Sequence, residues 1–176
     1  TFNYDGSFIF DPGDSFPYLS NGDSVGVYFE YRASDFGGNV SEPATITITV
    51  LGVNDAPVSF NDSVTTDEDT EYTGQVPEAT DSDGIDFNGY YSDGVLTPDQ
   101  GDLTFNDDGS FLFDPGADFQ YLSEGETAQV SFTYTASDVS GLISDPATIT
   151  ITVTGTNDVP EADDNTFSTN EDSLLV

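Results

Sequence analysis

The chain contains no cysteine, methionine, tryptophan or histidine, and its only basic residue is Arg32. Without cysteine or histidine it can form no disulfide, no thiolate or imidazole metal site, and no serine-histidine or cysteine-histidine nucleophile. Oxygen is therefore the only ligand atom that its side chains offer in number. Oxygen ligands select hard cations, calcium above all, and disfavour zinc and copper.

Against that single arginine stand 34 acidic residues, which give a formal net charge of -33. This charge excludes nucleic acid and anionic membranes as partners, and the mutual repulsion opposes compaction. Cations from outside the chain are needed to offset it. An acidic chain can also be disordered. However, 14 Phe, 9 Tyr and 35% hydrophobic residues are enough to form a core in a unit of ~100 residues.

The sequence repeats itself at a fixed interval. Residues 1–73 align without a gap on residues 104–176, a shift of 103 positions, and roughly half of the aligned residues are identical. A period of this length corresponds to a small domain rather than to one turn of a solenoid. We expect residues 1–57 to be the C-terminal half of one repeat, residues 58–160 a complete repeat, and residues 161–176 the first strand of the next, within a longer parent chain.

The repeat has the hydrophobic pattern of β-strands. Residues 148–153 alternate threonine with isoleucine or valine, which indicates a half-buried strand, and Asp108-Gly109 between two apolar runs indicates a tight hairpin. No stretch has helical periodicity. Seven short strands are predicted, at 63–66, 72–76, 89–95, 103–105, 111–114, 128–136 and 147–154. Such spacing is typical of an all-β, Greek-key sandwich of the immunoglobulin class.

Acidic residues gather at the ends of these predicted strands in motifs that resemble the cadherin repeat. The motifs are Glu68-Asp69, Ala79-Thr80-Asp81-Ser82-Asp83-Gly84, Ala136-Ser137-Asp138 and Thr156-Asn157-Asp158-Val159-Pro160. In the residues that form and flank these motifs, the chain is most similar to bacterial cadherin-like and VCBS-type tandem repeats. That resemblance implies a calcium-binding, cell-adhesion repeat, found in large secreted adhesins and biofilm matrix proteins.

The chain departs from the cadherin pattern at three points. Gly52 and Gly155 stand where cadherin linkers begin with aspartate, and Ala56 and Val159 stand where an asparagine follows Asn-Asp. The acidic motif expected before the sixth strand is absent. Three acids in that region are candidate substitutes: Asp118, Glu124 and Glu126. The resemblance therefore implies fewer calcium ions at each junction than the full cadherin set, one or two.

The sandwich topology itself predicts where the acids meet. The loops after the second and sixth strands lie at the end where the chain enters, so Asp81, Asp83 and Asp138 converge there, and Asn54 and Asp55 of the linker complete a cage of oxygens. Glu68, Asp69 and the three substitutes lie at the opposite end, beside Asn157 and Asp158. Asp35 is the counterpart of Asp138 in the earlier copy. Acids in turns, such as Asp107, are expected to serve local hydrogen bonds only.

Three other features of the sequence indicate a function only weakly. Asn39-Val40-Ser41 and Asn61-Asp62-Ser63 match the N-glycosylation acceptor pattern. Tyr90-Tyr91 places one ring outward on a strand, where it can stack on a sugar. The chain has so many carboxylates that some pairs will have the separation of the two catalytic carboxylates of a glycosidase. The sequence offers no tryptophan, histidine or recognisable cleft motif beside them, so no enzyme is predicted.

The sequence thus predicts an extracellular, calcium-stiffened rod of repeats that forms the fibre body of an adhesin or matrix protein. Its partners would be calcium, neighbouring repeats and, in a filament, like chains or polysaccharide. A calcium-dependent polysaccharide-binding module is the alternative. In residues 1–57 the inward residues Phe8, Phe10, Phe29 and Tyr31 are expected to lack covering strands.

Overall fold

The structure is a computed structural model that describes the chain except for residues 83, 85–86, 93, 95, 161 and 173–176. The described residues form nine β-strands and one short 3₁₀ turn, η1 (Gly13–Ser15). The strands are β1 (Ser24–Tyr31), β2 (Ala44–Leu51), β3 (Asp62–Asp67), β4 (Tyr72–Gln75), β5 (Phe87–Tyr91), β6 (Asp102–Phe105), β7 (Ser110–Asp114), β8 (Thr127–Asp138) and β9 (Ala147–Thr154). The predicted all-β class is confirmed.

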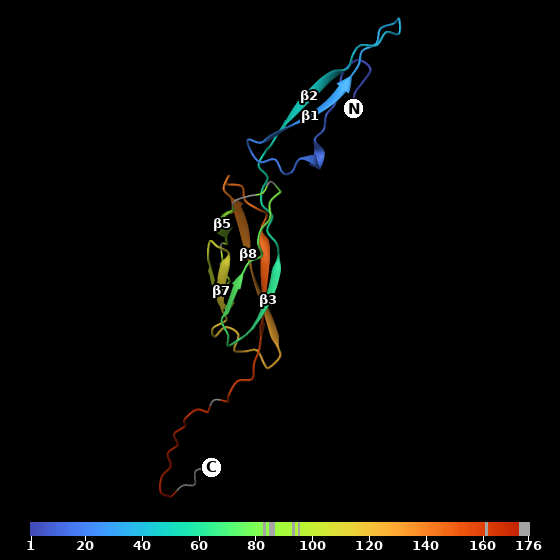
Figure 1. The fold of residues 1–176 in the computed structure, drawn as a ribbon. Helices are drawn as coiled ribbons and strands as arrows, with labels where there is room; N and C mark the ends of the chain where they lie inside the picture. The colour runs from blue at the N-terminus through green and yellow to red at the C-terminus, as the bar shows by residue number, and fades with distance from the viewer. Residues whose placement is uncertain (83, 85–86, 93, 95, 161, 173–176) are drawn as a thin grey trace.

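Strands β3 to β9 form a two-layer sandwich (Figure 1). One sheet has the order β3-β9-β8-β5 and the other the order β4-β7-β6. All neighbours pair antiparallel except β3 and β9, which run parallel with Val64 opposite Ile151. This architecture confirms the sandwich predicted from the strand spacing.

The core lies between the two sheets and is built from the inward residues of β7, β8 and β9. In β9 the apolar residues alternate with threonines, and Ile149, Ile151 and Val153 are almost completely buried. Phe111 and Phe113 of β7 pack against them with Phe132 and Tyr134 of β8. Burying each such side chain contributes about 1.5–3 kcal/mol, so the period-two pattern fixes which face turns inward.

The turn between β6 and β7 forms where the Asp108-Gly109 pair was predicted to place it. Gly109 adopts a φ of +81°, which a residue with a side chain rarely adopts. The Asp108 carboxylate accepts hydrogen bonds from the backbone N–H and the hydroxyl of Ser110. Asp107 and Asp108 thus sit in a turn, and the bonds accepted by the Asp108 carboxylate are local.

The strand limits differ from the predicted ones mainly at β5. This strand ends at Tyr91, whereas the sequence predicted a strand from residue 89 to residue 95; Val95 lies outside the described residues. The other predicted strands of the sandwich agree with the observed bounds to within two residues at each end.

Strands β1 and β2 form a separate two-stranded sheet that repeats the β8–β9 pairing. Ser24 pairs with Leu51 in the first, and Thr127 with Thr154 in the second, so the register is shifted by the same 103 positions. The repeat predicts counterparts of β6 and β7 before β1, but neither strand forms. Within residues 1–23, all of them described, the β pairing is confined to an isolated bridge between Phe2 and Phe8. In the sandwich, their counterpart β7 is held by β4, and no described strand plays that part here.

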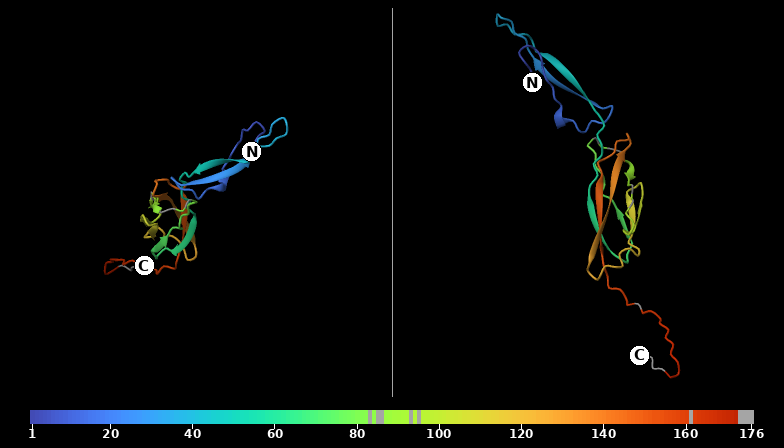
Figure 2. Two further views of the ribbon diagram at one scale, coloured as in Figure 1. Left: turned by 45° about the horizontal axis from the view of Figure 1, so that its top comes forward. Right: turned by 180° about the vertical axis from the view of Figure 1, so that it is seen from behind.

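The segment expected to be the first strand of a following repeat is not a strand in the described residues 162–172. Its counterpart β3 exists because it pairs with β9, and residues 162–172 have no strand beside them. Figure 2 shows the β1–β2 sheet and the sandwich lying end to end, with this C-terminal segment leaving from the far end of the sandwich.

Candidate metal-binding poles of the sandwich

We call the two ends of the sandwich the hairpin-side pole, which faces β1 and β2, and the C-terminal pole, from which the chain leaves. At the hairpin-side pole the linker is fixed to the sandwich by Tyr134. Its hydroxyl donates to the carbonyl oxygen of Phe60 at 2.8 Å and accepts from the Phe60 N–H at 3.3 Å. A backbone bridge between Val58 and Thr80 adds a second attachment. The linker residues before them are therefore held against the loops of the sandwich.

Asp138 is the buried acid of this pole. Its side chain is only 1% exposed. One carboxylate oxygen accepts from the Asn54 side-chain amide at 2.7 Å, and the other from the backbone N–H of Leu142 at 2.9 Å. Burial alone would raise the pKa of the Asp138 carboxyl. The hydrogen bonds from Asn54 and from the loop backbone outweigh that effect and hold its pKa below the ordinary value.

Asp55 reaches the neighbouring loop of the same pole. The hydroxyl of Ser82 donates to the Asp55 carboxylate at 2.8 Å, and Asp81 is half-buried beside Ser82 in the chain. The linker pair Asn54 and Asp55 thus contacts both loops that the sequence placed at this pole. Asp83, a predicted ligand of the same site, lies outside the described residues.

Glu68 is the buried acid of the C-terminal pole and is also 1% exposed. Its Oε1 accepts from the backbone N–H of Thr156 at 2.7 Å, while its Oε2 is buried and has no hydrogen-bond partner. The adjacent Asp69 accepts from the Thr156 hydroxyl at 2.8 Å and from the Gln120 amide at 3.1 Å, and these bonds lower its pKa. The outgoing linker is therefore attached to both acids.

The three acids predicted to substitute for the missing cadherin motif have different environments. Asp118 accepts from the backbone N–H of Gly101 at 2.9 Å, and Glu126 accepts from the N–H of Ser123 at 2.9 Å, which lowers the Glu126 pKa. These two carboxylates therefore brace loops, while Glu124 is exposed. Among the linker residues beside this pole, Asn157 and Asp158 are both exposed.

Asp35 lies away from both poles, in the loop between β1 and β2. Both its carboxylate oxygens accept hydrogen bonds from Asn39, one from the side-chain amide and one from the backbone, and these bonds lower the pKa of Asp35. The Asn39 amide of the first glycosylation triplet is thus already engaged. In the second triplet, Asn61 accepts from the backbone N–H of Thr148 at 2.7 Å.

Within the described residues, no group of three or more acidic side chains lies close enough together to hold a metal ion. At each pole the acids accept hydrogen bonds that link them to the adjoining linker. Thr156 donates to both Glu68 and Asp69 at one pole, and Asn54, which precedes Asp55, donates to Asp138 at the other. A complete cation cage would need further oxygens, from the exposed linker acids, from backbone carbonyls or from water.

Steric contact with the backbone explains why the two linkers begin with glycine. A Cβ atom on Gly155 would lie 2.3 Å from the carbonyl oxygen of Ser123, and one on Gly52 would lie 2.1 Å from that of Ser20. Any side chain at these positions would collide with backbone. The linker therefore cannot carry the aspartate that cadherins place there, and this ligand is missing from both junctions.

Sequence reasoning did not assign a role to Ser82, Thr156 or Gln120, which donate to the acids of the two poles. Ser82 and Thr156 fall inside the quoted motifs, so their position was a usable signal. Gln120 lies 51 residues from Asp69, and no local pattern indicates that contact.

The described residues include no helix long and apolar enough to cross a membrane.

Comparison with known proteins gives the following matches. The sequence matches the bacterial cadherin-like domain over residues 54–155, more than half of the chain. No match was found among curated proteins. Among solved structures, the sialic-acid-binding region of an adhesin from Streptococcus sanguinis, bound to 3'sLn, is 15% identical with a TM-score of 0.43, over 72% of this chain and 37% of that one.

Two protocadherin structures are similar to a comparable extent. Cadherin domains 1–5 of protocadherin gamma B2 are 15% identical with a TM-score of 0.44, over 77% of this chain and 33% of that one. Domains 1–4 of protocadherin gamma B7 are 18% identical with a TM-score of 0.42, over 77% and 42%. The chain thus spans less than half the length of each of these three solved structures.

Proposed function

The chain belongs to the family of bacterial cadherin-like domains, and on that premise we propose that it is a calcium-binding segment of an extracellular bacterial adhesin or biofilm matrix protein. In this proposal the sandwich is one unit of a rod or fibre, and calcium at its poles stiffens the junctions between units. The proposal assigns the chain no catalytic role.

The observation that carries the proposal is the environment of Glu68. Its carboxylate is buried, and one of its oxygens has no hydrogen-bond partner. A buried carboxylate without a compensating charge is destabilising by several kcal/mol. The only basic residue of the chain, Arg32, lies outside the sandwich. A cation from solvent is the remaining source of positive charge, and the all-oxygen surroundings suit calcium.

At the C-terminal pole, Glu68 and Asp69 would hold such an ion, with Asn157 and Asp158 as the linker ligands. At the hairpin-side pole, the candidates are Asn54, Asp55, Asp81, Asp83 and Asp138. When bound, the ion would neutralise the acids and offset the repulsion between them. Because each set combines linker and loop residues, binding would also restrict the angle between neighbouring units.

Small-angle scattering with and without a chelator tests this proposal. Removing calcium is expected to change the maximum dimension and to lower the thermal midpoint, because the neutralised charges lie at the poles while the aromatic core lies between the sheets. The titration should cover ~10⁻⁴ to 10⁻³ M calcium, the range typical of extracellular modules. If neither quantity changes in low salt, the calcium-stiffened rod is wrong.

Single variants test the ligand set. Asp81→Ala is expected to weaken calcium binding at the hairpin-side pole, and Asp107→Ala is expected to leave it unchanged, because Asp107 lies in the β6–β7 turn. Isothermal titration calorimetry measures both. Equal losses in the two variants would indicate diffuse attraction by the net charge rather than a defined site.

A calcium-dependent polysaccharide-binding module is the second candidate. The observation that favours it is Tyr91, which is 69% exposed at the end of β5, while the adjacent Tyr90 packs on Tyr134 and accepts a hydrogen bond from Ala79. An outward ring of this kind can stack on a sugar. A glycan array probed with and without calcium, using Tyr91→Ala as the control, separates this function from a purely structural one.

A further inference from the structure

The chain contains two Asn-Gly pairs, Asn21-Gly22 and Asn88-Gly89, which lie in different kinds of backbone. Asparagine followed by glycine is the pair in which the side-chain amide cyclises most readily onto the next backbone nitrogen, because glycine has no side chain to hinder the approach. The first pair lies in the turn before β1, and the second lies within β5, which pairs with β8. The first pair can therefore close a ring without leaving a sheet, whereas the second cannot.

Residues 20–23 form a hydrogen-bonded turn around the first pair. The Asp23 N–H donates to the Ser20 carbonyl oxygen at 3.0 Å, and Gly22 has a φ of +99°, the sign required at the third residue of a type II turn. The complete repeat has the same turn at residues 123–126, with a hydrogen bond of 2.8 Å and a glycine φ of +82°. Glutamate takes the place of the asparagine there, so a turn of this kind accommodates a carboxylate.

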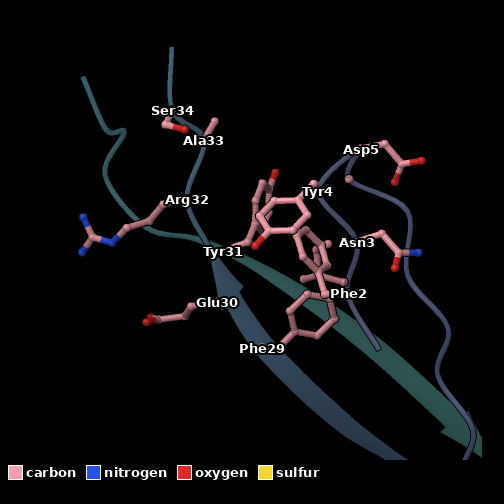
Figure 3. A pocket seen from close by; sticks show the side chains of 12 residues that line it. Phe2, Asn3, Tyr4, Asp5, Phe29, Glu30, Tyr31, Arg32, Ala33 and Ser34 are labelled. Carbon is pink, nitrogen blue, oxygen red and sulfur yellow. The ribbon is translucent and has the colours of Figure 1, made fainter. Parts of the chain in front are cut away.

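The exposure of Asn21 is reproduced in the complete sandwich. Figure 3 shows Tyr31 among other aromatic rings on one side of the β1–β2 sheet, but its counterpart Tyr134 is buried in the core, so not every exposed residue of the first copy stays exposed in the second. Glu124, the counterpart of Asn21, is exposed in the complete sandwich, and Asn21 itself is exposed with the following unit in place. This position is thus open to water both in a complete unit and at a junction.

The two groups that react in such a cyclisation make no hydrogen bonds among the described residues. The Gly22 N–H has no acceptor there, whereas the equivalent Gly125 N–H donates to the carbonyl oxygen of Gly155 at 3.0 Å. The side-chain amide of Asn21 has no hydrogen-bond partner either, and a Cβ placed on Gly22 would meet nothing within 4 Å. Both the attacking nitrogen and the space for the ring are therefore available.

From these observations we propose that Asn21 is a site of spontaneous deamidation, which converts it to aspartate or isoaspartate. The Gly22 nitrogen attacks Cγ of Asn21, the bond from Cγ to the side-chain nitrogen breaks, and ammonia leaves with the proton of the Gly22 N–H. Water then opens the cyclic imide at either of its two carbonyls. The net reaction consumes water, releases ammonia and leaves a carboxylate, so it needs no enzyme and no cofactor.

The modification alters the start of the linker. Either product adds a negative charge beside Asp23, whose backbone carbonyl accepts from the Gly52 N–H at 2.9 Å. Isoaspartate also routes the backbone through the former side chain and adds a methylene to it, so the hydrogen bond from Asp23 to Ser20 no longer fits the turn. We therefore expect isoaspartate to loosen the attachment of Gly52, and aspartate to leave it intact as glutamate does in the second copy. This inference does not depend on the calcium sites.

Peptide mapping by mass spectrometry tests the proposal on the full chain, incubated at mildly alkaline pH either folded or in guanidinium chloride. The two Asn-Gly pairs serve as controls for each other, because they share a dipeptide and differ in structure. In denaturant both should convert at similar rates. In the folded protein Asn21 should convert at close to its denatured rate, whereas Asn88 should convert roughly tenfold more slowly or less, since β5 must first open locally. Folded protein in which Asn21 stays intact would overturn the proposal, and equal conversion of both sites would overturn its assignment to the turn.

Asn21→Gln is the matched variant, because glutamine keeps the amide but has to close a larger and less favourable ring. It should abolish conversion at position 21 and leave that of Asn88 unchanged. Hydrogen exchange of the Gly52 amide measures the effect on the linker. Exchange should become faster as isoaspartate accumulates in the wild type and should stay unchanged in Asn21→Asp, which adds the charge alone. Unchanged exchange in protein rich in isoaspartate would overturn the proposed loosening of the linker.

Discussion

Glu68→Gln separates the free energy lost by burying a charge from the free energy gained by binding calcium. Glutamine keeps the shape of the side chain and the oxygen that accepts from the Thr156 N–H. It removes the negative charge from a buried position where one carboxylate oxygen has no partner. Leaving such a polar group unpaired costs about 1–3 kcal/mol, and more when it is charged. Glutamine still leaves one buried polar group without a partner, so only the cost of burying the charge is removed. In a chelator, the variant is therefore expected to be more stable than the wild type.

Calcium should stabilise the two proteins unequally. At a free concentration 100 times the Kd, a ligand that binds only the folded state adds about 2.7 kcal/mol to the free energy of unfolding. If the variant binds 100-fold more weakly, the same calcium adds only about 0.4 kcal/mol. The difference of about 2.3 kcal/mol corresponds to a difference of roughly 10–18 °C between the calcium-dependent shifts in Tm for a unit of ~100 residues.

Thermal unfolding followed by circular dichroism, in calcium and in a chelator, measures both effects. Glu71→Gln is the matched control: it removes the same charge three residues away, at an exposed position, and should change neither stability nor the calcium shift appreciably. The reasoning fails if Glu68→Gln keeps the full calcium-dependent increment. It also fails if the chelated variant is less stable than the chelated wild type.

Three further predictions follow from the described contacts. Gly155→Ala should destabilise the sandwich by about 1–3 kcal/mol in urea unfolding, because the added Cβ collides with backbone; no loss would mean that the linker can shift freely. Phe113→Ala should destabilise the protein by about 3–5 kcal/mol, whereas Phe10→Ala, at the exposed counterpart position, should change stability by less than about 1 kcal/mol; equal losses would show that Phe10 is buried in solution. The Asp138 carboxyl, titrated by NMR without calcium, should show a pKa below the ordinary value of an aspartate, and this pKa should rise in Asn54→Ala. Because its pKa is depressed by folding, its stabilising effect is complete above that ordinary value and is lost as the pH falls through the lower pKa of the folded state; an unchanged pKa in the variant would contradict this role for Asn54.

The sandwich was predictable because its strands are specified by local patterns. In residues 147–154 every second side chain is apolar, and the predicted and observed bounds of β9 coincide. The Asp108-Gly109 turn fixes the register of the adjacent hairpin in the same local way. These features depend on neighbouring residues only, so no knowledge of tertiary contacts was needed to find them.

The candidate sites were less predictable because hydrogen-bond partners are set by tertiary placement. Glu68, in a motif that resembles the cadherin repeat, and Asp118, a candidate substitute for a missing motif, were both predicted as metal ligands. Asp118 receives a backbone N–H from Gly101, while Glu68 is buried with an oxygen that has no hydrogen-bond partner. Pairings such as Asn54 with Asp138 link residues 84 positions apart, and only the closed sandwich brings them together.

The two copies within the chain show which interactions the sequence specifies by itself. Strands β1 and β2 repeat the register of β8 and β9, so the alternating pattern that the two copies share specifies this pairing. The segment from Phe8 to Phe10 is nearly identical to its counterpart in β7, yet it forms no strand where no equivalent of β4 pairs with it. Burial of the phenylalanines thus depends on the added strands and not on their own sequence.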